Sequence, residues 1–110
     1  MKIRIKATEI EMTPYLKGII KEKLAEISKH LRGKRAIIAE IEVGVTSRHH
    51  QKGDIYRAEI QIEIPGKLFR AVSEKEDFRS ALTDAKNEIE KQIRRHKDKK
   101  VADKRGVGKE

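Results

Sequence analysis

The segment AEIQIEIPG, residues 58–66, alternates apolar and polar side chains and then reaches a Pro-Gly pair. A period of two predicts a β-strand with its alanine and isoleucines on one face and its glutamates and glutamine on the other. Pro-Gly is a turn signal, so the chain is expected to enter another strand. In that strand Phe69, Ala71 and Ser73 share a face.

Two earlier segments alternate in the same way. Residues 2–8 place Ile3, Ile5 and Ala7 on one side and basic residues on the other. From about residue 36 to residue 46, the side chains expected to face the core are Ile37, Ala39, Ile41, Val43 and Val45. Each segment predicts a strand with one buried face, and residues 47–53 between the second and third strands read as a polar loop.

The remaining apolar residues have helical spacing. Thr13-Pro14 predicts a helix start, with Thr13 as the N-cap, and Gly33 suits its C-cap. The apolar stripe of this helix would consist of Leu16, Ile20, Leu24, Ile27 and Leu31. A second helix is expected to begin near Glu76-Asp77 and to end near Lys97. Its stripe would consist of Phe78, Leu82, Ala85, Ile89 and Ile93.

Two amphipathic helices and four strands with one apolar face predict an α+β domain. The order is β-α-β-β-β-α, with a four-stranded sheet that is mixed or antiparallel and two helices packed on one face. Residues 1–100 are expected to form this single domain, and residues 101–110 a flexible charged tail.

Composition limits the possible functions. The chain has 110 residues, no cysteine and a net charge of +9. The last twenty residues carry nine basic and three acidic side chains, so most of the positive charge lies there. This asymmetry favours a polyanion partner, with a structured RNA as the leading candidate. No apolar run could span a membrane or act as a signal peptide, so a cytoplasmic location is expected.

Catalytic and metal-binding patterns are weak in this sequence. Its carboxylates alternate with lysines on positions that face water, it has no Gly-rich phosphate loop, and no serine lies in a nucleophile motif. We therefore predict neither an enzyme nor a cofactor or small-molecule substrate. His49 and His50 could both reach a metal, but two exposed loop histidines are the simpler interpretation, so no metal site is predicted.

Basic side chains should instead project from the outer faces of both helices. If both apolar stripes pack on the sheet, these residues form a ridge with a groove between the helices, which suits contact with phosphates. Only four aromatic residues are present, and Phe69 and Phe78 read as core. Binding is therefore expected to depend on RNA shape more than on base stacking.

Several of these segments resemble the ribosome hibernation promoting factor family, also labelled sigma-54 modulation protein. The resemblance covers about residues 2–100, and its most specific part is Gln92-Ile-Arg-Arg-His-Lys97. The other matching motifs are Thr13-Pro14-x-Leu16, Glu22-Lys23-Leu24, Pro65-Gly66, Glu76-Asp77, Ala81-Leu82 and Glu90-Lys91. The sequence departs from the family at Arg79-Ser80-Ala81-Leu82-Thr83, where Tyr-Ala-Ala-Ile-Asp is common, and at Asn87-Glu88, where Asp-Lys is common.

The resemblance implies a translation inhibitor that acts in starvation or stress and stabilises inactive ribosomes. Such a protein binds 16S ribosomal RNA in the mRNA and tRNA channel of the 30S subunit, within the 70S ribosome, and is expected to be a monomer away from it. The family pattern carries over to Lys23, Lys29, Lys91, Arg94, Arg95 and Lys97 as RNA-binding residues. Surface geometry adds Lys21, Arg32, Lys34, Lys86, Lys99 and Lys100.

Three other functions fit the same sequence. A general double-stranded RNA or DNA binder would use the same basic helices, and a sigma-54 transcription modulator would act through protein contacts. An enzyme would have to use His49 and His50. Sedimentation with ribosomal particles separates a ribosome-bound factor from the nucleic-acid binder and the transcription modulator, and metal analysis tests the role of His49 and His50.

Overall fold

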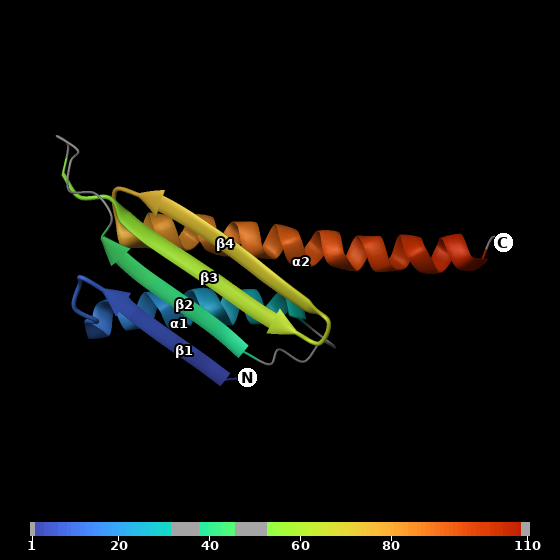
Figure 1. Ribbon diagram of the computed structural model, residues 1–110, viewed down its shortest axis with the longest axis horizontal. Coiled ribbons are helices and arrows are strands. Elements are labelled where there is room, and N and C mark those ends of the chain that lie inside the picture. Colours follow the sequence, from blue (N-terminus) through green and yellow to red (C-terminus); the bar gives the residue numbers. More distant parts are fainter. Residues whose placement is uncertain (1, 32–37, 46–52, 109–110) are drawn as a thin grey trace.

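The computed structural model in Figure 1 describes residues 2–31, 38–45 and 53–108, with side chains described as far as Lys99. Its order is β-α-β-β-β-α, as predicted, with one short 3₁₀ turn after the first helix. The elements are β1 (Lys2–Thr8), α1 (Pro14–Ser28), η1 (Lys29–Leu31), β2 (Ile38–Val45), β3 (Tyr56–Ile64), β4 (Lys67–Lys75) and α2 (Phe78–Gly108). No helix in these ranges is long and apolar enough to cross a membrane.

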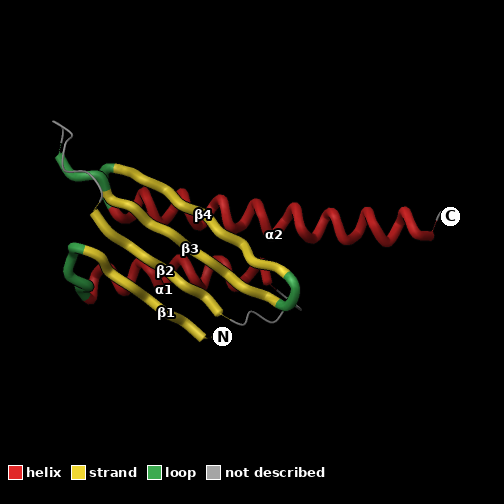
Figure 2. The backbone as a smooth tube through the Cα atoms, in the orientation of Figure 1, coloured by secondary structure: helices red, strands yellow, loops and turns green. Residues whose placement is uncertain are grey.

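The four strands form one mixed sheet in the order β1-β2-β3-β4. β1 and β2 are parallel, because α1 carries the chain back across the sheet between them. β2, β3 and β4 are antiparallel to their neighbours. Both helices lie behind the sheet in Figure 2, with α1 behind β1 and β2 and α2 behind β3 and β4. The predicted arrangement of two helices on one face is therefore confirmed.

The core lies between the sheet and the two helices. The predicted inward residues of β3 are all buried, and Phe69, Leu82 and Ile89 are fully covered. β1 is the main exception, because Ile5 and Ala7 are only half-buried and Ile3 is 48% exposed. Val45 of β2 and Phe78 of α2, also predicted to face the core, are half-buried. The helices thus cover the middle of the sheet more completely than its β1 edge.

Local signals at the helix starts and at the hairpin act as expected. The backbone N–H of Leu16 donates to Thr13 Oγ1 over 3.1 Å, which makes Thr13 the N-cap of α1. Asp77 precedes α2 and accepts hydrogen bonds from the N–H of Ser80 at 2.8 Å and from its hydroxyl at 2.9 Å. Gly66 has a φ of 80° in the turn between β3 and β4, a conformation that glycine adopts readily.

The expected end of the second helix near Lys97 is wrong. α2 continues to Gly108 and extends well beyond the sheet in Figure 1. The physical reason is that residues 98–105 contain no glycine or proline, so nothing interrupts the helical hydrogen bonds before Gly106. The flexibility of the tail at 101–110 stays a prediction, and the expected C-cap at Gly33 lies outside the described residues.

Candidate nucleic-acid interface

The C-terminal half of α2 carries a group of basic side chains that face water. This distal basic face consists of Lys91, Arg94, Arg95, Lys97 and Lys99. All are exposed except Lys97, which is half-buried. Ile89 and Ile93 are buried on the opposite side of the helix at 0% and 2% exposure. At 3.6 residues per turn, this places Lys91, Arg94 and Arg95 directly away from the core.

Contacts with β4 fix the rotation of α2 and therefore the direction in which the distal basic face points. Gln92 donates to the carbonyl of Arg70 at 2.8 Å and accepts from its N–H at 3.1 Å. His96 lies edge-on to the buried ring of Phe69, with the ring centroids 5.6 Å apart. In residues 92–97, the segment that most specifically resembles the family, one side of the helix therefore contacts β4 and the other side faces water.

The cations of the distal basic face are not neutralised by ion pairs with described residues, and Asp98 is the single acidic residue among residues 91–99. Within the described part of the chain, none of its five side chains forms an ion pair with a carboxylate. Because no carboxylate of the described residues pairs with these cations, they produce a positive potential along one side of the helix, which attracts an external anion. They therefore have the chemistry needed for phosphate contact.

The seam between the two helices has a different character from the expected basic groove. Lys86 of α2 lies 3.1 Å from Glu26 of α1 and 3.3 Å from Glu90, and its side chain is only 13% exposed. Lys23 is 10% exposed and lies 3.2 Å from Glu22 and 3.8 Å from Glu26. Both lysines are therefore already paired, and Lys86 joins α2 to α1 through Glu26.

The charge of Lys86 is secured by these partners. Burial alone would lower the pKa of its ammonium group, but the hydrogen bond to Glu26 and the charge of Glu90 outweigh burial and raise the pKa above its ordinary value. His30 of η1 extends the network, with Nε2 3.2 Å from Glu90. At the other end, Arg79 lies 3.3 Å from Glu22.

The acidic partners are the part of this surface that sequence reasoning missed. Two pairs had a signal, since Lys23 and Glu26 are three residues apart and Lys86 and Glu90 are four apart. The contact of Lys86 with Glu26 joins two helices far apart in sequence, so no local spacing could reveal it.

The other predicted RNA-binding residues are spread over the molecule. Lys29 is exposed on η1, near the end of α1. Lys21 is exposed and borders a groove beside β1, so it does not join the distal basic face. Arg32 and Lys34 lie outside the described residues, and Lys100 belongs to α2 although its side chain is not described.

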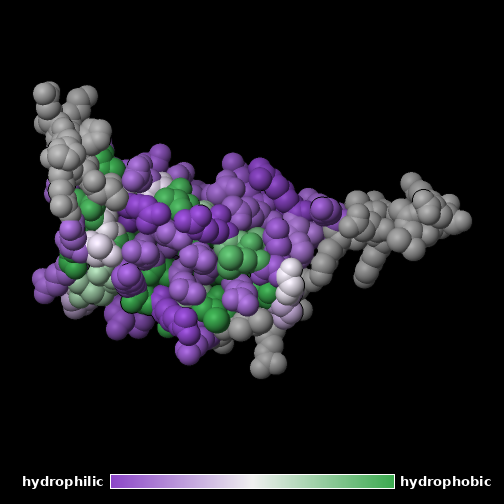
Figure 3. Space-filling model, viewed as in Figure 1, coloured by the Kyte–Doolittle hydropathy of each residue, from purple (hydrophilic) through white to green (hydrophobic). Residues whose placement is uncertain are grey.

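The open face of the sheet is polar and charge-paired. Figure 3 shows it mostly hydrophilic, with scattered hydrophobic residues. Glu59 lies 3.0 Å from Arg57 and 2.8 Å from Arg70, and it accepts a 2.8 Å hydrogen bond from Gln61. The hydrogen bond from Arg70 is the main reason that the pKa of Glu59 is lowered, although burial opposes it.

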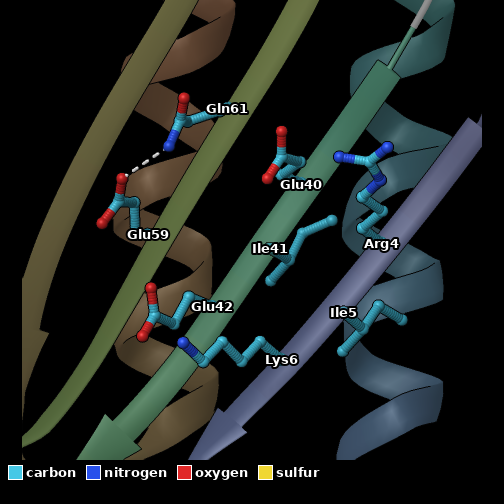
Figure 4. Close-up of a pocket in the computed structure, with 8 residues that line it drawn as sticks. All are labelled: Arg4, Ile5, Lys6, Glu40, Ile41, Glu42, Glu59 and Gln61. Carbon is cyan, nitrogen blue, oxygen red and sulfur yellow. Dashed lines mark hydrogen bonds between the residues drawn. The ribbon is translucent and has the colours of Figure 1, made fainter.

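A shallow pocket of about 210 Å³ adjoins this cluster, as Figure 4 shows. Arg4 pairs in register with Glu40, and Lys6 pairs with Glu42, so charges of both signs line it. Among the described residues, no three histidine or acidic side chains are grouped as metal ligands would be. His49 and His50 lie outside those residues, so the absence of a metal site there stays a prediction.

Comparisons with known proteins agree on one family. The family described as "Sigma 54 modulation protein / S30EA ribosomal protein" matches residues 3–101. The "Ribosome hibernation promotion factor" of Bacillus subtilis is 26% identical over 99 residues, covering 90% of this chain and 50% of that protein. The chain thus spans half the length of this relative. The "Ribosome hibernation promoting factor" of Pseudomonas putida is also 26% identical, covering 90% of this chain and 89% of the relative.

Solved structures support the same assignment. The N-terminal domain of Protein Y from Thermus thermophilus superposes with a TM-score of 0.74 at 26% identity, covering 87% of this chain and 99% of that one. A ribosomal subunit interface protein from Coxiella burnetii has a TM-score of 0.73 at 16% identity, over 88% and 98% of the two chains, which shows a shared fold. Because the family match spans almost the whole folded region, this chain belongs to the Sigma 54 modulation protein / S30EA ribosomal protein family.

Proposed function

We propose that this protein is a ribosome-associated hibernation factor. It binds 16S ribosomal RNA in the mRNA and tRNA channel of the small subunit, at the A and P sites. By occupying that channel it blocks translation in starvation or stress and stabilises inactive ribosomes. The names of the matched relatives support ribosome association, and the free cations of the distal basic face supply the means of contact.

The single observation that carries this proposal is the separation of two kinds of basic residue. Lys23 and Lys86 are paired with carboxylates inside the seam between the helices. Lys91, Arg94 and Arg95 face away from the core with no acidic partner among the described residues. The unpaired group can exchange its counterions for RNA phosphates, and such exchange favours binding entropically.

Recognition through phosphates suits a factor that binds one folded RNA. Aromatic rings that could stack on bases are scarce, and Phe69 is fully buried. A rigid helix fixed to the sheet by Gln92 presents its cations in a set order. Only an RNA whose phosphates have a matching arrangement would engage all of them together.

The test replaces Arg94, Arg95 and Lys97 with Ala and measures binding to purified 30S subunits over a range of salt concentrations. Each lost phosphate contact should flatten the log-log salt dependence by about 0.7 to 0.9. The control replaces Lys2, Lys67 and Lys75, which are exposed on the strands, and removes the same charge. Equal salt slopes for the two triple variants would place the RNA site elsewhere.

Sedimentation decides between the proposal and its alternatives. Protein from stationary-phase cells should travel with 30S or 70S particles on a sucrose gradient, and the Ala variant should shift to the top. If the protein stays at the top in every growth phase, ribosome association is rejected. Equal affinity for 30S subunits and for an unrelated RNA duplex would favour the general nucleic-acid binder instead.

A further inference from the structure

The two edges of the sheet differ in how they are protected. At the β4 edge, the side-chain amide of Gln92 occupies both the N–H and the carbonyl of Arg70. At the other edge, β1 pairs with β2 on one side and with no strand on its outer side in the described part of the chain. An edge strand of this kind offers a row of main-chain donors and acceptors to an extended segment.

An apolar groove lies directly beside β1 on the helix side of the sheet. Its volume is about 490 Å³, and it is lined by Ile3, Ile5, Ala7, Met12, Lys17 and Lys21. Ile3 is 48% exposed, and Ile5 and Ala7 are half-buried, so the inward face of β1 is only partly covered. Side chains of an added strand that point to the helix side would meet this apolar surface.

Basic residues border the edge on both faces. Lys2, Arg4 and Lys6 alternate with the apolar residues and point to the open face of the sheet, where Figure 4 shows Arg4 and Lys6. On the helix side, Lys17 and Lys21 stand one turn apart on α1 at the rim of the groove. These five cations outnumber Glu40 and Glu42, the carboxylates opposite Arg4 and Lys6 on β2, so the edge selects against a basic occupant and favours an acidic one.

The same charges argue against a second copy of this chain as the occupant. Antiparallel pairing of β1 with β1 of another molecule, centred on Arg4, would place Arg4 opposite Arg4 and Lys2 opposite Lys6 on the open face. Directly opposed like charges destabilise a strand pair, and lysines on edge strands commonly prevent such association.

We propose that the β1 edge and its groove form a docking site for an extended segment of another protein, with apolar and acidic side chains in alternation. The segment adds to the sheet as a fifth strand beside β1. Its apolar side chains enter the groove over Ile3 and Ile5, and its carboxylates lie beside Lys2 and Lys6. Main-chain hydrogen bonds supply affinity, and the alternation supplies specificity.

The probe is a capped peptide of alternating Glu and Val with seven residues, the length of β1. Titrated into the isotopically labelled full chain, it should shift the amide resonances of residues 2–8 more than those of β4. A block peptide of the same composition, with its valines together, should bind more weakly because it cannot place its carboxylates and apolar groups on opposite faces. Equal shifts from both peptides would overturn the proposal.

A second peptide separates strand addition from simple charge attraction. It keeps all side chains but carries N-methyl groups at alternate residues, which removes the main-chain donors toward β1. If the peptide adds to the sheet as a strand, the N-methylated peptide should no longer bind. Unchanged binding of this peptide would contradict the proposal. A shift of the β1 amides by single-stranded RNA with the same charge dependence would also overturn it, by assigning the edge to nucleic acid.

Matched variants test the residues. Replacing Lys2 and Lys6 with Gln should weaken peptide binding by about twofold to thirtyfold, the range for two exposed ion pairs. Replacing Lys67 and Lys75 with Gln removes the same charge from the opposite edge strand and should leave binding unchanged. Ile3→Thr keeps strand propensity but removes apolar surface, and it should also weaken binding. Equal behaviour of the two double variants, with unfolding midpoints unchanged, would reject the site.

Discussion

Lys86 and Lys91 are five residues apart on α2 and have opposite environments. The ammonium group of Lys86 lies between Glu26 and Glu90, whereas Lys91 is exposed and free of ion pairs among the described residues. A cation between two half-buried carboxylates stabilises the fold, because its removal would leave those charges partly desolvated and unpaired. The same residue type therefore serves structure at one position and is available for binding at the other.

Replacing Lys86 with Gln should lower the free energy of unfolding by about 1 to 3 kcal/mol, because Glu26 and Glu90 lose their shared cation. Lys91→Gln, the matched control, should leave stability within about 0.5 kcal/mol of wild type and weaken 30S binding. Urea unfolding and a 30S binding assay on both variants give the comparison. A stable Lys86→Gln variant that binds poorly would instead assign Lys86 directly to the RNA site.

Glu59 plays the corresponding part on the open face of the sheet. Its carboxylate lies between Arg57 and Arg70, and its pKa is lowered chiefly by the hydrogen bond from Arg70. A lowered pKa in the folded state means that ionised Glu59 adds stability above its ordinary pKa of 4.5. This contribution is lost as the pH falls through the lowered value.

Glu59→Gln should therefore lower the free energy of unfolding by about 1 kcal/mol at neutral pH, with little difference from wild type in strong acid. Urea midpoints measured at neutral pH and well below pH 4 test this dependence. Glu63→Gln, on the same strand and exposed, serves as the control and should have a small effect at both values. A constant loss for Glu59→Gln at every pH would show that its charge is not responsible.

At the scale of elements, periodicity was enough to predict the order of the helices and strands and most of their buried faces. The alternation from Ala58 to Ile64 and the helical stripe from Leu82 to Ile93 reflect burial against a single layer, and burial is what hydrophobic spacing records. The end of α2 was harder to predict, because Ile93 is the last apolar residue of the stripe and His96 makes the last contact with a core ring among the described side chains. There, the absence of helix breakers before Gly106 was the better signal.

The candidate site was less predictable than the fold. Sequence places Lys23, Lys86 and Lys91 all on polar helix positions, and only the packing of α1 against α2 separates paired from free cations. The weak cover over β1 is likewise a property of where two helices sit on four strands. Local alternation at Ile3 predicted burial, yet almost half of its surface remains exposed.

At the scale of the whole molecule, α2 makes the protein elongated, with principal extents of 59 × 28 × 18 Å. Among the side chains that are described, which end at Lys99, Ile93 is the last core residue of α2, and His96 is the last to contact a core ring. Figure 2 shows the last turns of α2 projecting past the end of the sheet. The packed part of α2 should therefore determine stability, whereas its projecting turns should contribute to RNA binding without affecting stability.

A chain that ends at Lys99 should keep the unfolding midpoint of the full chain. It should lose only the part of the helical circular dichroism signal that comes from the last turns of α2. Its affinity for 30S subunits should fall, with a shallower salt dependence, because basic residues are removed. A full-length variant with Lys100, Lys104 and Lys109 replaced by Gln distinguishes charge from helix length. If truncation lowers the midpoint substantially, the end of α2 contributes to the folded domain.

The projection of α2 also affects how the molecule approaches a partner. The last twenty residues hold +6 of the total +9, and residues 91–108 form the C-terminal part of α2, whose last turns extend past the sheet. Charge displaced this far along the long axis gives the molecule a large electric dipole. The field of a polyanion then turns the protein helix-first during diffusional encounter, so productive collisions become more frequent before any contact forms. Added salt should act first on this orienting step, and hence on the association rate.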